Sequence, residues 1–319
     1  MHVHMSSSDN SSRSFVSIGM FIVDEFSFAD GDGKPTGKTM AAQIGGGGTY
    51  ASIGARIWLP PSKVGMIIDR GHDFPGHIQE ALDAYGSDMW LYRDDPNRGT
   101  TRALNVYRGE YRGFEYLTPK LRITPHDLDD TKLARPDIVH FICSPSRAAV
   151  ILSEIKQDEG WHPTTVYEPI PDRCVPEELP SLQKVLSDVS ILSPNAEEAL
   201  SLLSLPEVPT KERVEEACRR FLDMGVGSEN SGKVVDVTGA GNSFLGGLGA
   251  GLVHSQGDVR QATLYATVSA SFTIEQAGLP CLTLISDETG TPVERWNGDS
   301  PHDRLQALQD RLGRKLQSE

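Results

Sequence analysis

The chain has 319 residues, 38% of them hydrophobic and 23% charged, a composition typical of a soluble globular protein with a sizeable core. Its formal net charge of −14 and pI near 5.1 argue against nucleic-acid or anionic-membrane partners, because a polyanion would be repelled. No uninterrupted apolar segment approaches the ~20 residues needed to cross a bilayer, and we expect a cytoplasmic protein.

The first 14 residues are polar and lack the apolar centre of a secretory signal, so we expect a disordered leader. The cysteines are scattered singly, without the spacing of a metal site or a disulfide framework. We therefore expect buried, reduced thiols at Cys143, Cys174, Cys218 and Cys281.

The N-terminal third alternates strand and helix patterns. "SFVSIGMFIVDEF" predicts a strand that ends in acidic residues, and "GDGKPTGKT" a connecting loop. Small and apolar residues after a run of four glycines predict a helix from Thr49 to Leu59. "SKVGMII" predicts a second strand, and "DFPGHIQEALDAYG" a helix closed by Gly86. Beyond it, the alternation around Gly109 is typical of a β-hairpin.

Short apolar strands then alternate with amphipathic helices, from "DIVHFIC" to "AEEALSLL". This rhythm predicts an α/β fold, with a mainly parallel central sheet sandwiched by helices. Helices rich in glycine and alanine and a final polar helix complete the chain. We expect one domain over residues 15–319, with a small β lid formed near residues 15–45 and 98–120.

The segment "VVDVTGAGN" predicts a strand, a glycine turn and the start of a helix. Converging backbone N–H groups at Gly239, Ala240 and Gly241, with the positive end of the helix dipole, would form an anion site. Judged on spacing alone, a tight turn without any ligand is an equally good interpretation.

Several motifs in order resemble the PfkB, or ribokinase-like, family of carbohydrate kinases over most of residues 15–280. "DVTGAGN" is similar to the D-T-x-G-A-G-D signature, and "PNAEE" to the N-x-x-E motif. "GGGGTYASIGAR" is similar to the glycine-rich substrate segment, and "DFPG" to a D-x-F-G neighbourhood. Within the family, the sequence looks closest to fungal members related to a killer-toxin maintenance protein.

The resemblance implies transfer of the γ-phosphoryl group of ATP to the alcohol of a small-molecule acceptor, with Mg²⁺. Such transfer depends mostly on positioning and charge neutralisation. Open lid strands can pair across a two-fold axis, so a homodimer remains an open expectation. The resemblance implies four groups of residues. The catalytic residues are Gly239, Ala240, Gly241 and Asn242, and the nucleotide is bound by Asp236 and Thr238. The acceptor is bound by Asp24, Gly45, Gly46 and Tyr50, and the metal by Asn195 and Glu198.

Asn195 and Glu198 also have an ordinary structural interpretation. Three residues apart at the start of a helix, they match an N-cap and a capping-box partner. A carboxylate there could also hold Mg²⁺ through water, because this ion retains several waters. The two interpretations are compatible.

Two substitutions depart from the family pattern. Asn242 stands where the family has an aspartate general base, and an amide cannot accept a proton at neutral pH. Loss of general-base catalysis typically costs ~10²–10⁴-fold, although Asn242 can still orient an alcohol. Tyr50 replaces an asparagine of the acceptor segment, which favours a nucleoside, an aromatic alcohol or no acceptor over ribose bound in the usual way.

The third departure is a missing section. Only "VGSENSGKV" precedes the "VDVTGAGN" segment after the helix "KERVEEACRRFLDMG". The family places there a strand, a T-x-G-x-x-G turn for ATP and a hairpin, which would need several times more residues. The chain is either a short variant with an incomplete ATP site or the product of a gene model or transcript that skipped a segment.

Two functions follow as hypotheses: a carbohydrate kinase of weakened activity, or a non-catalytic pseudokinase that serves as a small-molecule sensor or assembly surface. A dinucleotide-binding oxidoreductase is not supported. The glycine run lacks the G-x-G-x-x-G spacing, and no acidic residue follows ~20 positions later.

Overall fold

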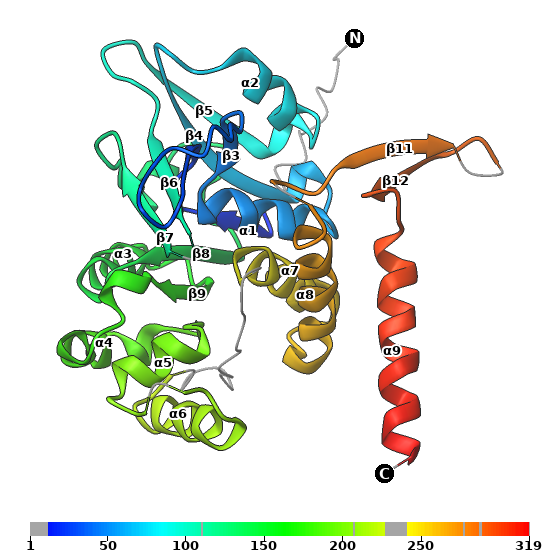
Figure 1. The fold of residues 1–319 in the computed structure, drawn as a ribbon. Helices are drawn as coiled ribbons and strands as arrows, with labels where there is room; N and C mark the ends of the chain where they lie inside the picture. Colours follow the sequence, from blue (N-terminus) through cyan, green and yellow to red (C-terminus); the bar gives the residue numbers. More distant parts are fainter. Residues whose placement is uncertain are drawn as a thin grey trace, which may run out of the picture.

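The computed structural model describes residues 12–318 except 110, 207, 227–240, 277 and 287–288. Its centre is a six-stranded parallel sheet with the strand order β10-β9-β8-β1-β4-β5 (Figure 1). The mainly parallel sheet predicted from the sequence is therefore confirmed. The strands are β1 (Phe15–Ser17), β4 (Val64–Gly71), β5 (Trp90–Asp95), β8 (Ile138–Cys143), β9 (Thr164–Pro169) and β10 (Ile191–Leu192).

Helices cover both faces of this sheet because its strands are apolar on both sides. Phe15 of β1 joins one core cluster and the next residue, Val16, joins the other. The first face carries α1 (Gly47–Arg56), α2 (Gly76–Asp83), α7 (Gly241–His254), α8 (Val259–Thr273) and α9 (Pro301–Ser318). The second carries α3 (Pro145–Gln157), α4 (Leu179–Gln183), α5 (Ala196–Leu202) and α6 (Lys211–Asp223).

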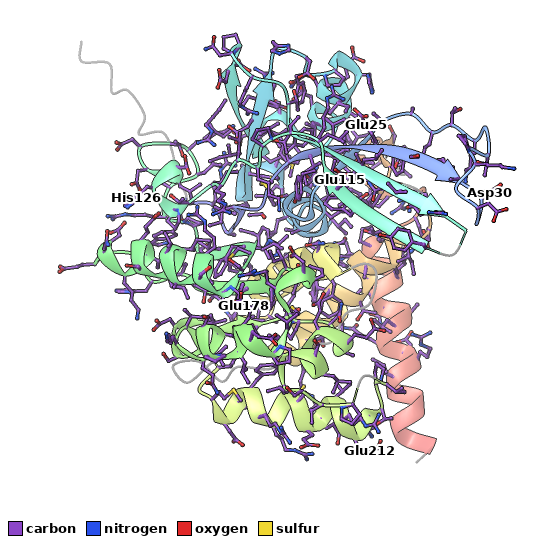
Figure 2. All side chains as sticks on the ribbon, turned by 60° about the vertical axis from the view of Figure 1, so that its left-hand side comes forward. Glu25, Asp30, Glu115, His126, Glu178 and Glu212 are labelled. Carbon is purple, nitrogen blue, oxygen red and sulfur yellow. The ribbon has the colours of Figure 1, made fainter. Side chains whose placement is uncertain are left out.

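A separate four-stranded sheet forms the predicted lid. Its order is β3-β2-β6-β7, and β6 and β7 form the hairpin expected around Gly109, which has a φ of 57°. Figure 2 shows its strands running outward, with Asp30 at the far end of β2. The strands are β2 (Ile22–Ala29), β3 (Gln43–Gly45), β6 (Arg102–Arg108) and β7 (Tyr111–Tyr116).

The lid is joined to the body by charged side chains at the base of β6. The Arg102 guanidinium lies 2.9 Å from Glu25 Oε1 and 2.9 Å from Asp73 Oδ2. Burial alone would raise the pKa of Asp73, but hydrogen bonds from Thr100 and Arg102 outweigh it and lower that pKa to about 2. These contacts hold the lid strands over the carboxyl ends of the central strands.

The structure differs from the sequence predictions near the N-terminus. Phe15–Ser17 belongs to the central sheet rather than to the lid, since all three residues are buried between two parallel neighbours. Arg13 and Ser14, expected in a disordered leader, are also buried, and Arg13 pairs with Asp88 at 3.1 Å. The helix expected over Thr49–Leu59 begins at Gly47 and ends at Arg56.

Helices α1 and α7 approach each other backbone to backbone. A Cβ atom added to Gly246 of α7 would lie 1.8 Å from the Ala51 carbonyl oxygen of α1. One added to Gly54 of α1 would lie 2.0 Å from the Ser243 carbonyl oxygen. Only glycine permits this spacing, which brings the N-terminal ends of α1 and α7 to the same side of the sheet.

The sequence patterns did not indicate a C-terminal antiparallel hairpin, β11 (Leu282–Ser286) with β12 (Pro292–Trp296). It is anchored where Trp296 stacks on Tyr85 and Arg56 pairs with Glu294. Helix α9 then runs beside α8 toward the C-terminus (Figure 1). No helix in the described part of the chain is long and apolar enough to cross a membrane.

Candidate functional site

A cavity of about 580 Å³ lies between the lid and the carboxyl ends of the central strands. Ligands of open α/β sheets bind at these strand ends, and the volume is in the range of small-molecule sites. The cavity walls come from β2, β6 and β7 of the lid, β8 and β9 of the central sheet, and the first turns of α1 and α7.

Asp24 lies on β2 and packs against the glycines that precede α1. A Cβ atom on Gly45 would lie 2.1 Å from Asp24 Oδ2. Gly46 has a φ of 90°, and a Cβ there would lie 2.2 Å from the Met20 carbonyl oxygen. Glycine at these two positions avoids both close contacts. Asp24, Gly46 and the half-buried Tyr50 line the cavity, and Gly45 lies directly behind Asp24.

Asn242 enters the same cavity from the first turn of α7, which begins at Gly241. Its Oδ1 atom is buried without a hydrogen-bond partner in the described part of the chain, and a Cβ on Gly47 would lie only 2.6 Å from it. The N-terminal amides of a helix have no intrahelical acceptors and favour an anion. Asp236, Thr238, Gly239 and Ala240 lie outside the described residues, so their roles stay predictions.

Two further cavity residues, Glu168 and Asn105, did not figure in the sequence prediction. Glu168 lies near the end of β9, and its Oε2 atom is buried without a hydrogen-bond partner among the described residues. Asn105 lies on the lid strand β6, is only 4% exposed, and has an Nδ2 atom that likewise lacks a described partner. A carboxylate at the end of the strand pattern "TTVYEPI" was the available signal for Glu168.

A row of polar side chains on three neighbouring strands, Ser17, His140 and Glu168, leads to the cavity. Ser17 Oγ accepts a hydrogen bond from Gly19 N and lies 3.0 Å from His140 Nδ1. The Ser17 hydroxyl and the His140 imidazole thus share a hydrogen bond, and the tautomer of the ring decides which of the two donates. Nε2 lies 3.8 Å from Glu168 Oε2. The fully buried His140 ring therefore lies beside the Glu168 carboxylate, away from solvent.

Asn195 and Glu198 form the capping box expected at the start of α5. Asn195 Oδ1 accepts from Glu198 N at 2.8 Å, and Glu198 Oε2 accepts from Asn195 N at 2.9 Å. They do not line the cavity. Burial, followed by repulsion from Glu168 and Glu197, raises the pKa of Glu198 to about 7 against the opposing Asn195 hydrogen bond.

This environment fits a hydrated Mg²⁺. The Oε1 atom of Glu198 is not used by the cap, and a divalent cation would relieve the repulsion between Glu198 and Glu168. The described residues hold no cluster of three metal-ligating side chains. Mg²⁺ does not need one, since it keeps most of its waters and binds through one or two carboxylates.

The raised pKa of Glu198 predicts a pH effect on stability. Because the folded-state value of about 7 lies above the usual 4.5, the native state binds more protons between these values. The free energy of unfolding should therefore fall as pH rises from about 4.5 to about 7, by an amount on the order of 1 kcal/mol after solvent screening. Mg²⁺ should stabilise the protein more at pH 8 than at pH 5.5.

Thermal unfolding of Glu198→Gln across this pH range, with and without Mg²⁺, tests the effect. The variant should lose both the pH slope and the Mg²⁺ response. Glu197→Gln changes an exposed neighbour that makes the smallest contribution to the raised pKa of Glu198, so it should keep most of the pH slope and of the Mg²⁺ response. An unchanged slope in Glu198→Gln would assign the titration to another group.

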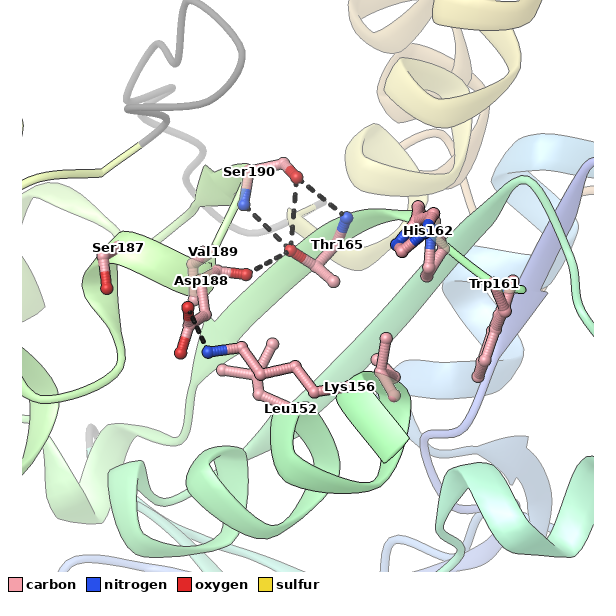
Figure 3. Close-up of a pocket in the computed structure, with 11 residues that line it drawn as sticks. Leu152, Lys156, Trp161, His162, Thr165, Ser187, Asp188, Val189 and Ser190 are labelled. Atoms are coloured by element: carbon pink, nitrogen blue, oxygen red, sulfur yellow. Dashed lines mark hydrogen bonds and ion pairs between the residues drawn. The ribbon is translucent and has the colours of Figure 1, made fainter. Parts of the chain in front are cut away.

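A second cavity, of about 290 Å³, lies at the opposite ends of the strands, beside the start of β9 (Figure 3). Its polar groups are occupied by one another. Thr165 Oγ1 bonds to the Asp188 carbonyl oxygen, to Ser190 N and to Ser190 Oγ, and Lys156 pairs with Asp188 at 2.6 Å. Few polar groups remain to orient a ligand, so the cavity under the lid is the better functional site.

Comparisons with known proteins agree with the fold. Residues 223–281 match the model of the pfkB family of carbohydrate kinases. An uncharacterized protein of Schizosaccharomyces pombe is 34% identical over 91% of each chain, and protein MAK32 of Saccharomyces cerevisiae is 32% identical over 82% of this chain and 84% of its own. A ribokinase structure from Giardia lamblia covers 84% of this chain and 94% of its own, with a TM-score of 0.62 and 19% identity.

The alignment with the S. pombe protein also bears on the section that is missing between α6 and α7. The alignment with the S. pombe protein is 343 positions long, which exceeds the whole length of this chain. It therefore contains positions at which this chain has no residue. Among the described residues, the two-residue strand β10 is the last strand at this edge of the sheet.

Proposed function

This chain belongs to the pfkB family of carbohydrate kinases, and we propose that it transfers the γ-phosphoryl group of ATP to an alcohol of a sugar, nucleoside or related small molecule. The observation that carries the proposal is the cavity shared by Asp24 and Asn242. An acceptor-binding carboxylate and the first turn of the phosphate-binding helix face one space, from segments more than 200 positions apart in the sequence.

In this proposal Asp24 accepts hydrogen bonds from acceptor hydroxyls, and Gly46 and Gly47 let the acceptor approach the backbone. Asn242 orients the reacting hydroxyl. The amides of the α7 N-terminus, with those of Gly239 and Ala240, stabilise negative charge on the phosphoryl oxygens. Asp236 and Thr238 hold the turn against the nucleotide.

The acceptor oxygen forms the new bond to phosphorus as the bond to the ADP oxygen breaks. The hydroxyl proton leaves late in a loose transition state and passes to water, because the Asn242 amide cannot take it. Asn195 and Glu198 would hold Mg²⁺ through its waters, and the ion would supply neutralisation of phosphate charge. This chemistry predicts slow transfer rather than none.

A second candidate is a non-catalytic pseudokinase that binds a small molecule. It is favoured by the amide at residue 242 and by the short connection between α6 and α7. The cavity and its carboxylates are retained in either case, so the two functions differ in nucleotide binding and turnover.

Nucleotide binding separates them. If the kinase proposal is correct, Mg-ATP and Mg-ADP at a hundred times their Kd should each add about 2.7 kcal/mol to the free energy of unfolding. Mg²⁺ alone and ATP with a chelator serve as controls. ADP release in the presence of polyols then measures turnover. Absence of a nucleotide-dependent shift contradicts the kinase proposal and favours the pseudokinase.

A further inference from the structure

The cavity under the lid is strongly acidic. It is lined by two carboxylates, Asp24 and Glu168, which come from different sheets. No lysine or arginine is found among the described residues that line it. A ligand that enters this space meets negative charge on two sides, which disfavours phosphorylated sugars and sugar acids.

The nearby surroundings add to this charge. Burial, followed by repulsion from Asp24 and Asp172, raises the pKa of the Tyr116 phenol, which lines the same cavity. Three carboxylates, Asp24, Asp172 and Glu168, therefore lie at or near the cavity, while one positive charge, Lys120 Nζ, lies 4.2 Å from the centroid of the Tyr116 ring.

The unsatisfied polar atoms of the cavity call mainly for hydrogen-bond donors. Glu168 Oε2 and Asn242 Oδ1 are acceptors, and both are buried without a described hydrogen-bond partner. Asn105 Nδ2 is the single donor of this kind in the cavity, within the described residues. Buried polar groups left without partners are costly, so a ligand that fits here must offer more donors than acceptors.

Aromatic side chains also line the cavity. Phe114 and Tyr116 of the lid meet edge to face, with ring centroids 5.2 Å apart, and Tyr50 of α1 lines the same cavity. Aromatic faces attract cations as well as carbon–hydrogen surfaces. The cavity therefore combines two carboxylates with three aromatic side chains, and both kinds of group favour a positively charged ammonium group.

We propose that the ligand of this cavity is a polyhydroxylated compound with a protonated amine, whose ammonium group binds between Asp24 and Glu168 while a hydroxyl oxygen accepts from Asn105. As a statement about the acceptor of the transferred phosphoryl group, the inference rests on the proposed function. As a statement about binding, it holds for a pseudokinase as well.

Three six-carbon compounds that differ only at C1 test this ligand class. At C1, 1-amino-1-deoxysorbitol carries an ammonium group, sorbitol a hydroxyl group and gluconate a carboxylate. Calorimetric titration without nucleotide, at constant ionic strength, should show the amine binding at least about tenfold more tightly than sorbitol. Gluconate should show no saturable binding. Equal affinity for the amine and sorbitol, saturable binding of gluconate, or no binding of the amine overturns the proposal.

Variants connect the preference to the two carboxylates. Glu168→Gln and Asp24→Asn should each lower the preference for the amine by about tenfold. Glu168→Gln should leave sorbitol affinity within about threefold, whereas Asp24→Asn also weakens sorbitol binding because Asp24 accepts from hydroxyls, so its effect is the ratio of the amine affinity to the sorbitol affinity. An unchanged circular dichroism spectrum would show that each variant is folded. Glu177→Gln removes an exposed carboxylate outside the cavity and should keep the full preference. A preference that survives in both cavity variants contradicts the assignment.

The outcome is independent of the kinase test. Binding of the amine without any response to Mg-ATP would retain the ligand class and support a sensor. A response to Mg-ATP together with transfer only to sorbitol would retain the kinase and reject the ligand class.

Discussion

Replacing Asn242 with aspartate is expected to raise the rate of ATP-dependent phosphoryl transfer by about 10²–10⁴-fold. The substitution changes the amide into a carboxylate of nearly the same shape, at a position where Gly47 leaves no room for a larger group. The carboxylate can accept the hydroxyl proton that the amide cannot. ADP release at saturating Mg-ATP, with each polyol in turn, measures the change.

Asn242→Ala provides the control. It removes the hydrogen bond that orients the acceptor, so transfer should fall below that of the unsubstituted protein. If Asn242→Asp binds Mg-ATP and yet transfers no faster, the missing base does not limit the reaction. If neither variant binds Mg-ATP, the shortened connection before α7 has removed the nucleotide site and the pseudokinase interpretation holds.

Gly246→Ala is expected to lower the free energy of unfolding by about 3 kcal/mol, a large effect for one methyl group. The new Cβ would lie 1.8 Å from a backbone oxygen and 2.6 Å from a backbone nitrogen of α1. Because no side chain can rotate away, the two helices must move apart. The melting temperature should fall by about 6 °C or more.

Gly313→Ala is the matched control, since no atom lies within 4 Å of the position that its Cβ would take in α9. Alanine there should leave stability unchanged or raise it by up to about 1 kcal/mol, because it favours the helix. Gly246→Ala should also weaken ligand binding, because α1 and α7 both contribute to the cavity and the substitution moves them apart. Equal stability of the two variants would contradict the close helix contact.

The sequence alone determined much of the architecture. Alternating apolar strands and amphipathic helices indicated a mainly parallel sheet between helices, and Gly109 indicated the lid hairpin. The family motifs pointed to Asp24, Gly46, Tyr50 and Asn242, which do line one cavity. Asn195 and Glu198 formed the cap that their spacing predicts. These features are local or carried by contiguous motifs, so periodicity and spacing were sufficient to find them.

Other features were decided only by the tertiary structure. Glu168 and Asn105 lie in unremarkable strands, and their importance arises because the lid folds over the end of β9 and leaves their polar atoms without partners. The row from Ser17 through His140 to Glu168 exists because parallel pairing places β1, β8 and β9 side by side. No local pattern encodes such a neighbourhood, since a cavity's charge balance depends on contacts between residues that are distant in sequence.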